Sequence, residues 1–249
     1  MNDERPVQPN RKIDSRYGSS SGIGLACAQA AADEGAKVFV TGRNRERVQG
    51  ALGSLAGDGH ASLLGDLTVE EDVRALAEAA PPLDGIVFNA GIMPRLIPFQ
   101  MVDTKHVDEV MQVNFLAPVA LLGQLLRKKK IANGCSIVFI TTVGVFVAPP
   151  ASSIYIASKA ALTGFARCVA LDLVRRQIRS NCVALGYVKT DFTAKHVPQD
   201  QLDLSPLSMA EPADITGPVL FLLSDASRWI TRSNLIVDGG ISLKQSLGM

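Results

Sequence analysis

The stretch Gly18-Ser19-Ser20-Ser21-Gly22-Ile23-Gly24 decides the fold of this chain. Glycines at this spacing let the backbone turn tightly, approach a pyrophosphate and pack the next helix against a sheet. A helix expected over Ile23–Glu34 would direct its free N–H groups and its positive dipole end at those phosphates. Taken alone, the segment fits a phosphate-binding turn and an ordinary serine-glycine loop equally well, so the flanking sequence has to decide.

Short apolar runs alternate with amphipathic stretches along the whole chain, which is typical of βαβ units. The expected strands are Lys37–Thr41, Ser62–Leu64, Gly85–Phe88, Ser136–Thr141, Arg179–Ala184 and Leu235–Val237. The expected helices after the first are Arg45–Leu55, Val69–Ala79, Lys105–Arg127, Ser153–Arg175 and Ala213–Leu223. The pattern predicts an α/β protein with one doubly wound, Rossmann-type domain over residues 13–249, in which helices flank a parallel sheet. The polar residues 1–12 are expected to be a flexible N-terminal segment.

The strand that feeds the glycine turn is the least regular of the set. Ile13–Tyr17 is the run available for it, and this run contains Asp14 and Arg16. A central parallel strand would bury these charges, which is costly unless they are paired. The glycine turn needs a strand before it, but the composition of this run gives no physical account of one.

Composition and charge exclude several classes of function. Hydrophobic residues make up 47% and charged residues 20% of 249 residues, as in a globular domain with a substantial core. The net charge of +1 indicates neither a nucleic-acid partner nor a membrane surface, and the basic run 127–130 is interpreted as a solvated helix C-terminus. The four cysteines and three histidines show no metal-ligand spacing, so no metal is predicted. Residues 1–12 lack the apolar centre of a secretion signal, and a cytoplasmic location is expected.

The end of the second expected strand bears on the choice of cofactor. It lies roughly 20 residues beyond the glycines, where a Rossmann-type fold places a residue against the adenosine ribose. A carboxylate there would bind the 2′-hydroxyl of NAD, but the sequence has Thr41-Gly42-Arg43. The guanidinium of Arg43 suits a 2′-phosphate, so NADP is expected and NAD is less favoured.

Tyr155 and Lys159 are one helical turn apart, so their side chains share a face. A free tyrosine has a pKa of about 10 and transfers protons poorly near neutral pH. A nearby ammonium favours the phenolate and can lower the tyrosine pKa by about one to three units. The pair therefore predicts proton transfer to an alkoxide or from an alcohol.

With these residues in place, the chain resembles the short-chain dehydrogenase/reductase family over nearly its whole length. The resemblance rests on five motifs in order: GSSSGIG at 18–24, Asp66-Leu67, Asn89-Ala90-Gly91, YIASK at 155–159 and VDGG at 237–240. In overall layout the chain is similar to the 3-oxoacyl-carrier-protein reductases. The cofactor-binding residues so implied are Gly18, Ser20, Ser21, Gly22, Ile23, Gly24, Arg43, Asp66, Leu67, Asn89, Ala90, Gly91, Tyr155, Lys159, Val188 and Thr190.

The resemblance also implies four catalytic residues. Tyr155 would be the proton donor or acceptor, and Lys159 would lower its pKa and bind the nicotinamide ribose. Asn114 matches the helix asparagine that holds a relay water. Thr142, 13 residues before the tyrosine, stands where the family has its catalytic serine and keeps the hydroxyl. The region from Asp191 to about Ser208 corresponds to the variable substrate lid, and Met93 and Phe146 are candidate pocket residues.

The chain departs from the family pattern in four features. Tyr17 replaces the threonine before the first glycine, and polar residues replace the apolar strand ahead of it. Leu185 stands where a proline usually precedes Gly186, and Arg232 stands where a glycine usually sits before the last strand. These changes favour weakened cofactor binding as one interpretation.

Three hypotheses remain open from the sequence. The first is an NADP(H)-dependent oxidoreductase that acts on a small-molecule carbonyl or alcohol. The second uses the same chemistry with NAD on a sugar or polyol, and the third is a catalytically impaired nucleotide-binding homologue. For assembly, the resemblance implies a homo-oligomer, a tetramer or dimer, built through Lys105–Arg127 and Ser153–Arg175. Leu162, Phe165, Val169 and Leu173 lie along one side of the second helix, where they serve either that interface or the core.

Overall fold

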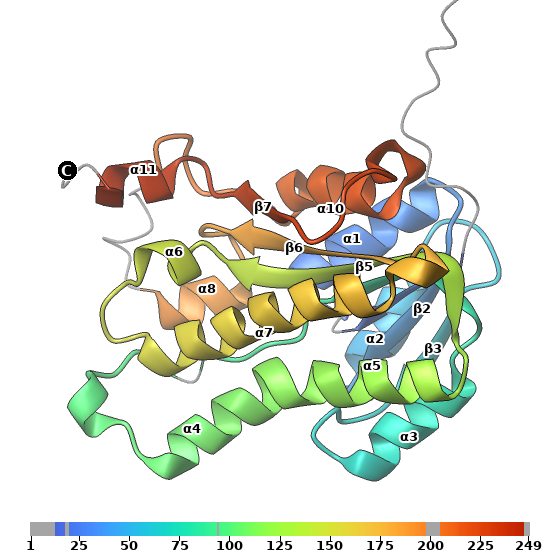
Figure 1. Ribbon diagram of the computed structural model, residues 1–249, viewed down its shortest axis with the longest axis horizontal. Coiled ribbons are helices and arrows are strands. Elements are labelled where there is room, and N and C mark those ends of the chain that lie inside the picture. The colour runs from blue at the N-terminus through green and yellow to red at the C-terminus, as the bar shows by residue number, and fades with distance from the viewer. Residues whose placement is uncertain (1–12, 18–19, 94, 198–204, 247–249) are drawn as a thin grey trace, which may run out of the picture.

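A computed structural model describes residues 13–17, 20–93, 95–197 and 205–246 (Figure 1). Seven parallel strands form one sheet in the order β3-β2-β1-β4-β5-β6-β7. The strands are β1 (Ile13–Tyr17), β2 (Lys37–Gly42), β3 (Ala61–Leu64), β4 (Leu83–Phe88), β5 (Ile131–Thr142), β6 (Arg179–Leu185) and β7 (Asn234–Val237). The strand order reverses between β1 and β4, so the predicted doubly wound α/β fold is confirmed. The expected N-terminal segment 1–12, Gly18 and part of the expected lid lie outside the described residues.

Helices cover both faces of the sheet (Figure 1). They are α1 (Gly22–Asp33), α2 (Arg45–Gly53), α3 (Glu70–Ala79), α4 (Thr104–Met111), α5 (Ala117–Arg127), α6 (Gly144–Val147), α7 (Ser153–Asp172), α8 (Asp191–His196), α10 (Thr216–Leu223) and α11 (Ile241–Ser246). One core cluster joins α3, α5 and α7 to the sheet, and two others join α1, α2 and α10 to its opposite face. Apolar burial on both faces explains why most strands read as continuous apolar runs.

The irregular first strand occupies the centre of the sheet. β1 pairs in parallel with β2 from Ile13↔Lys37 to Tyr17↔Thr41, and with β4 from Asp14↔Gly85 to Tyr17↔Phe88. The strand that the glycine turn needs is therefore present, although the composition of this run does not account for it. It brings the glycine turn to the point where the strand order reverses.

The long helix expected over Lys105–Arg127 is broken by one π-helical turn, Gln112–Leu116, between α4 and α5. Pro118 explains the break, because a proline has no N–H to donate to the carbonyl four residues earlier, which is that of Asn114. The helix therefore widens by one residue at Asn114. Such turns are often found at functional sites.

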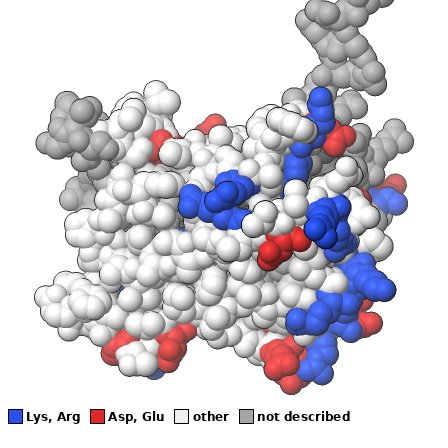
Figure 2. Space-filling model, viewed as in Figure 1, with Lys and Arg blue, Asp and Glu red and all other residues white. Residues whose placement is uncertain are grey.

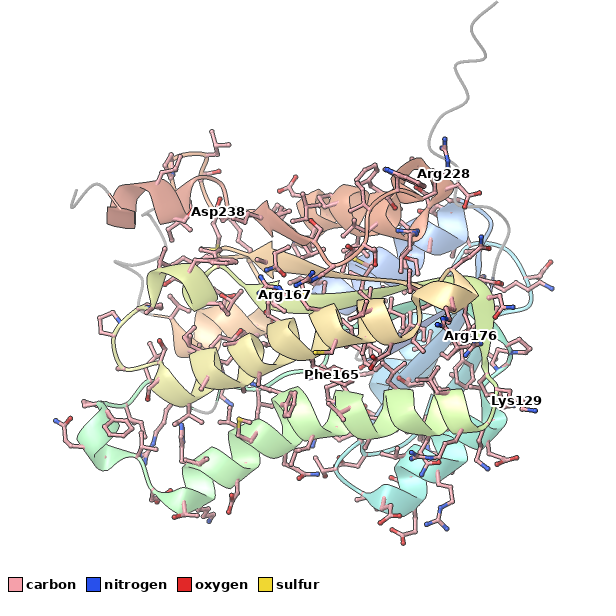
Figure 3. All side chains as sticks on the ribbon, viewed as in Figure 1. Lys129, Phe165, Arg167, Arg176, Arg228 and Asp238 are labelled. Carbon is pink, nitrogen blue, oxygen red and sulfur yellow. The ribbon has the colours of Figure 1, made fainter. Side chains whose placement is uncertain are left out.

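Helix α7 packs through the apolar side that the sequence left open to two interpretations. Leu162 and Val169 are buried in the core, and Phe165 and Leu173 pack against it. Figure 3 shows Phe165 between α7 and α5, and its ring lies edge-on to Phe139 and Phe115. These four residues belong to the core, so an interface through α7 would use its opposite side.

Two helical stretches are long and apolar enough to span a membrane by length and composition. They are Thr104–Arg127 and Ser153–Asp172, and 39% of each apolar window is buried inside the protein. Both pack against the sheet, and core helices of globular proteins pass the same test.

Candidate active site

A cleft of about 710 Å³ lies at the carboxyl ends of the strands, where the strand order reverses. Loops that follow β2, β3, β4, β5 and β6 line it, together with the start of α1 and parts of α7 and α8. Among the predicted site residues, it is lined by Ser20, Ser21, Gly22, Ile23, Arg43, Asp66, Leu67, Asn89, Ala90, Gly91, Thr142, Tyr155, Lys159, Val188 and Thr190. Gly24 is buried within α1, and Asn114 acts from behind the cleft wall.

The start of α1 has the features of an anion site. Ser21 is the N-cap residue, its side chain caps no backbone N–H, and the first turn contains no acidic residue. Gly22 has φ +52°, and a Cβ there would lie 3.3 Å from Cγ2 of Thr190. A glycine is required at this position both by the backbone and by the narrow space. The free N–H groups at this end of α1 therefore face the cleft and fit a pyrophosphate.

Arg43 and Asp66 meet at the other end of the cleft. Arg43 Nη1 lies 3.3 Å from Asp66 Oδ2, and the Arg43 side chain is exposed. Burial alone would raise the pKa of Asp66, but hydrogen bonds from Thr68 and the charge of Arg43 hold it below its usual value. Sequence reasoning missed Thr68, and also Asn44 and Arg47, which line this end. Charged and hydrogen-bonding side chains thus surround the position expected for the adenosine ribose.

The third side of the cofactor position is formed after β4. Asn89, Ala90 and Gly91 line the cleft there, and a Cβ on Gly91 would lie 3.1 Å from Nζ of Lys159. The cleft thus runs from Arg43, past the start of α1, to Lys159 and Tyr155. This arrangement of a glycine-lined wall, helix N-terminus and cationic end fits a nicotinamide dinucleotide.

Tyr155 and Lys159 both lie in α7 and line the cleft, as their spacing predicts. Lys159 is buried and its Nζ donates to the carbonyl of Ile140 at 3.0 Å. Burial lowers the pKa of Lys159 to about 8, because it removes water from the ammonium. Burial likewise raises the pKa of Tyr155 to about 12. The expectation that the pKa of Tyr155 is lowered is therefore wrong for the cofactor-free protein. Burial removes water from the charged phenolate and so raises this pKa.

Thr142, at the end of β5, has its hydroxyl engaged with the backbone. Its Oγ1 donates to the carbonyl of Leu185 at 3.3 Å and accepts from the N–H of Gly144 at 3.2 Å. The first contact is long for an O–H donor, so its loss would cost little. The hydroxyl can therefore rotate toward a substrate oxygen in the cleft.

Asn114 lies in the π-helical turn and hydrogen-bonds to two other parts of the site. Its Oδ1 accepts from the N–H of Ile92 at 2.7 Å, and its Nδ2 donates to the Ile92 carbonyl and to Ser158 Oγ. Ser158 Oγ in turn donates to the carbonyl of Tyr155 at 2.7 Å. This chain ties the loop after β4 to the helix that carries the tyrosine. The role of Ser158 was missed from the sequence, although it lies inside YIASK. The relay water assigned to Asn114 by resemblance stays a prediction.

Helix α8 places an aromatic ring next to the tyrosine. The ring centres of Phe192 and Tyr155 are 6.3 Å apart. Met93 lines the cleft as expected, whereas the other candidate, Phe146, is exposed and is not among the lining residues. The apolar character of Phe192 was visible in the sequence, but its position beside Tyr155 was not.

Arg232, the residue that stands where the family has a glycine, adopts a left-handed backbone conformation with φ +62°. Its N–H donates to the carbonyl of Ser180 at 2.8 Å, which holds this conformation in place. A residue other than glycine pays about 1–2 kcal/mol there. The strain lies just before β7, at the end of the strand away from the cleft.

We expect Arg232→Gly to raise the free energy of unfolding by about 0.5–1 kcal/mol, because the relief of strain exceeds the extra chain entropy of glycine. Urea unfolding measures the change. Arg228→Gly is the matched control, since Arg228 has φ −55°, and it should lower stability by a similar amount. A less stable Arg232→Gly protein would contradict the strain argument.

Comparison with known proteins agrees with this geometry. A family model described as enoyl-(acyl carrier protein) reductase matches residues 18–242. The human 3-oxoacyl-[acyl-carrier-protein] reductase is 35% identical over 240 residues, which cover 93% of this chain and 98% of that protein. Human dehydrogenase/reductase SDR family member 4 is 31% identical over 235 residues, or 89% of this chain and 84% of that protein. A solved dehydrogenase/reductase from Sinorhizobium meliloti 1021 has a TM-score of 0.85 at 31% identity and covers 94% of this chain and 97% of its own. The chain therefore belongs to the short-chain dehydrogenase/reductase family of NAD(P)-dependent oxidoreductases.

Proposed function

We propose that this protein reduces a ketone or aldehyde to the alcohol with NADPH, and that Tyr155 supplies the proton. One observation carries the proposal: Tyr155 and Thr142 line the same cleft as the N-terminal residues of α1 and Arg43. A phosphate site, a cationic ribose site and a proton donor are thereby combined in one continuous space. The reductases among the relatives are consistent with this direction.

The chemistry follows from what each side chain can do. A bound nicotinamide dinucleotide supplies the hydride to the carbonyl carbon. Tyr155 Oη donates its proton to the carbonyl oxygen, which completes the alcohol, and the raised pKa keeps the phenol protonated at neutral pH. The hydroxyl of Thr142 gives up its hydrogen bond to the Leu185 carbonyl and donates to the same substrate oxygen. The ammonium of Lys159 stabilises the phenolate that Tyr155 becomes.

Arg43 supports the choice of NADPH over NADH. Its guanidinium is exposed at the ribose end of the cleft, and the ion pair with Asp66 holds it in place there. It can therefore still bind an anion. A 2′-phosphate can accept two N–H bonds from it, whereas a 2′-hydroxyl leaves the cation with one weak acceptor. In an NAD-dependent protein, the residue expected at this position is Asp or Glu, whose carboxylate binds the 2′-hydroxyl.

We expect Arg43→Asp to lower the kcat/KM ratio of NADPH to NADH by about 100-fold or more, because it replaces a charge-assisted bond with repulsion of the phosphate. Parallel titrations of the purified protein with the two cofactors, by fluorescence and by initial rates, measure this. Arg45→Asp is the control, since Arg45 is exposed in the first turn of α2 and does not line the cleft. A wild-type preference for NADH would overturn the NADPH assignment. Failure to bind either cofactor would favour the catalytically impaired homologue.

For assembly, we propose a homodimer or homotetramer that uses the outer sides of α5 and α7. Much of the face over these helices is uncharged, and basic side chains gather at the end where α5 ends (Figure 2). Leu171 and Val174 expose 73% and 52% of their surface at the end of α7, and Leu116 exposes 46% at the start of α5. Light scattering at micromolar concentration tests this, and a monomer would contradict it.

A further inference from the structure

The part of the cleft beyond Tyr155 is lined by apolar side chains from four separate segments. They are Met93 and Leu96 after β4, Pro149 after α6, Ile156 in α7, and Phe192 and Val197 at the lid. Met93 is almost fully buried, and the other five are partly exposed to the cleft. No single element creates this wall; it exists because the loop after β4, α7 and α8 converge on the tyrosine.

Phe192 is the member of this wall whose ring lies beside that of Tyr155. Its ring centre lies 6.3 Å from that of Tyr155, with the planes tilted by 43°. His196 also meets it edge-on, with ring centres 5.3 Å apart. Burial and the neighbouring Lys195 both lower the pKa of His196. Phe192 thus has an aromatic contact with Tyr155 and a second one within its own helix.

Six charged side chains line the cleft, among the residues that the structure describes. Arg43, Arg47 and Asp66 are at the ribose end, and Lys159 lies in the tyrosine's own helix. At the rim, Lys189 forms an ion pair with Glu211, and Asp191 is exposed at the start of α8.

Several polar side chains near this end already have partners, among the residues that the structure describes. Ser152 donates its hydroxyl to the carbonyl of Pro149, and the hydroxyls of Thr190 and Thr193 contact each other. The ammonium of Lys159 donates to the carbonyl of Ile140, and that of Lys189 is paired with Glu211. A substrate carboxylate or further hydroxyl against the apolar wall would therefore lose water without gaining a free partner there. Each such unpaired group weakens binding by about tenfold or more.

We infer that the substrate is an uncharged ketone whose substituent is an apolar alkyl or aryl group, and that Phe192 selects for that group. This inference rests on the proposed carbonyl reduction and deepens it. It distinguishes this protein from enzymes that act on polyhydroxylated sugars or on keto acids. Substrates of either kind would place unpaired polar groups against Met93, Ile156 and Phe192.

Three ketones test the substrate class with NADPH. They are 2-octanone, 2-oxooctanoate, in which a carboxylate replaces the methyl group next to the carbonyl of 2-octanone, and erythrulose, an open-chain keto sugar. We expect kcat/KM for 2-octanone to exceed the other two by about 100-fold or more, since each carries a charge or several hydroxyls without partners. Equal or faster turnover of erythrulose or 2-oxooctanoate overturns the inference and leaves carbonyl reduction standing.

Binding without turnover separates this inference from the proposed function. With NADP⁺ present no hydride is available to a ketone, and calorimetry then reports ketone binding alone. Tighter binding of 2-octanone than of erythrulose supports the apolar site even if no ketone is reduced, in which case the proposed function fails by itself. Equal affinities overturn the apolar site.

The role of Phe192 is tested by truncation. We expect Phe192→Ala to raise KM for 2-octanone by about tenfold, through loss of apolar contact, and to change kcat/KM for acetone by less than about threefold. Phe99→Ala is the matched control, because Phe99 is 73% exposed and does not line the cleft. Unchanged 2-octanone kinetics in Phe192→Ala, or an equal loss with acetone, would remove Phe192 as the selecting residue.

Discussion

Replacing Tyr155 by phenylalanine is expected to lower kcat by about 10³–10⁴-fold, with the protein still folded and still able to bind NADPH. The phenol is the proton donor that faces the cleft, and its removal leaves the developing alkoxide with the hydroxyl of Thr142 alone. The ring itself is kept, so its packing against Phe192 persists. Loss of turnover without loss of structure therefore isolates the proton transfer.

Steady-state rates with 2-octanone, cofactor titration and thermal unfolding measure the three parts of this prediction. Tyr187→Phe is the matched control, because Tyr187 also lines the cleft and burial also raises its pKa. We expect it to cost less than about tenfold. Undiminished turnover in Tyr155→Phe would remove Tyr155 from the reaction, and an equal loss in both variants would point to the cleft surface and not to one phenol.

Lys159→Met is expected to abolish most activity, by about 10²–10³-fold, and yet to stabilise the cofactor-free protein. Activity falls because no cation remains to stabilise the Tyr155 phenolate. Stability rises because burial lowers the pKa of Lys159 from 10.5 to about 8, a penalty on the charged form on the order of 3 kcal/mol below pH 8. The lost hydrogen bond to Ile140 offsets about 1 kcal/mol of this gain.

The gain should depend on pH in one direction. Between pH 8 and pH 10.5 the unfolded chain binds more protons at this lysine than the folded protein does, so the wild type becomes more stable as the pH rises. Lys159→Met lacks this titration, and its advantage should shrink over the same window. Urea unfolding at pH 7 and pH 10 measures it. Lys189→Met, at an exposed lysine paired with Glu211, should show no comparable gain. A Lys159→Met protein less stable than wild type at pH 7 would show that the ammonium is not penalised by burial.

The sheet was largely predictable from the chain because local pattern and connection rules both point to it. All six expected strands are present, and each lies within the observed element. β1 is the instructive case, since Asp14 and Arg16 disfavour a central strand, and yet the strand is needed between β2 and β4 to deliver the glycine turn. Its position in the order of elements was the better predictor than its composition.

The departures from expectation arise where distant segments meet. The π-helical turn at Asn114 depends on Pro118, which is local, but its use depends on Ile92 and Ser158, which lie 22 and 44 residues away in the chain. The expected pKa of Tyr155 came from one neighbouring charge, whereas burial by the surrounding structure outweighs that charge and moves the pKa the other way. Desolvation is a property of the assembled site and has no sequence pattern.

The sequence by itself determined the doubly wound fold, the glycine turn, the ribose-end arginine and the tyrosine-lysine pair, because each depends on short-range spacing and on the obligatory order of βαβ units. Only the tertiary structure decided that the hydroxyl of Thr142 donates to the carbonyl of Leu185 and that the backbone of Arg232 is strained. It alone also decided that the ring of Phe192 lies beside that of Tyr155. These features depend on how loops from different strands pack against one another. Packing contacts between segments far apart in the chain leave no periodic signal in it.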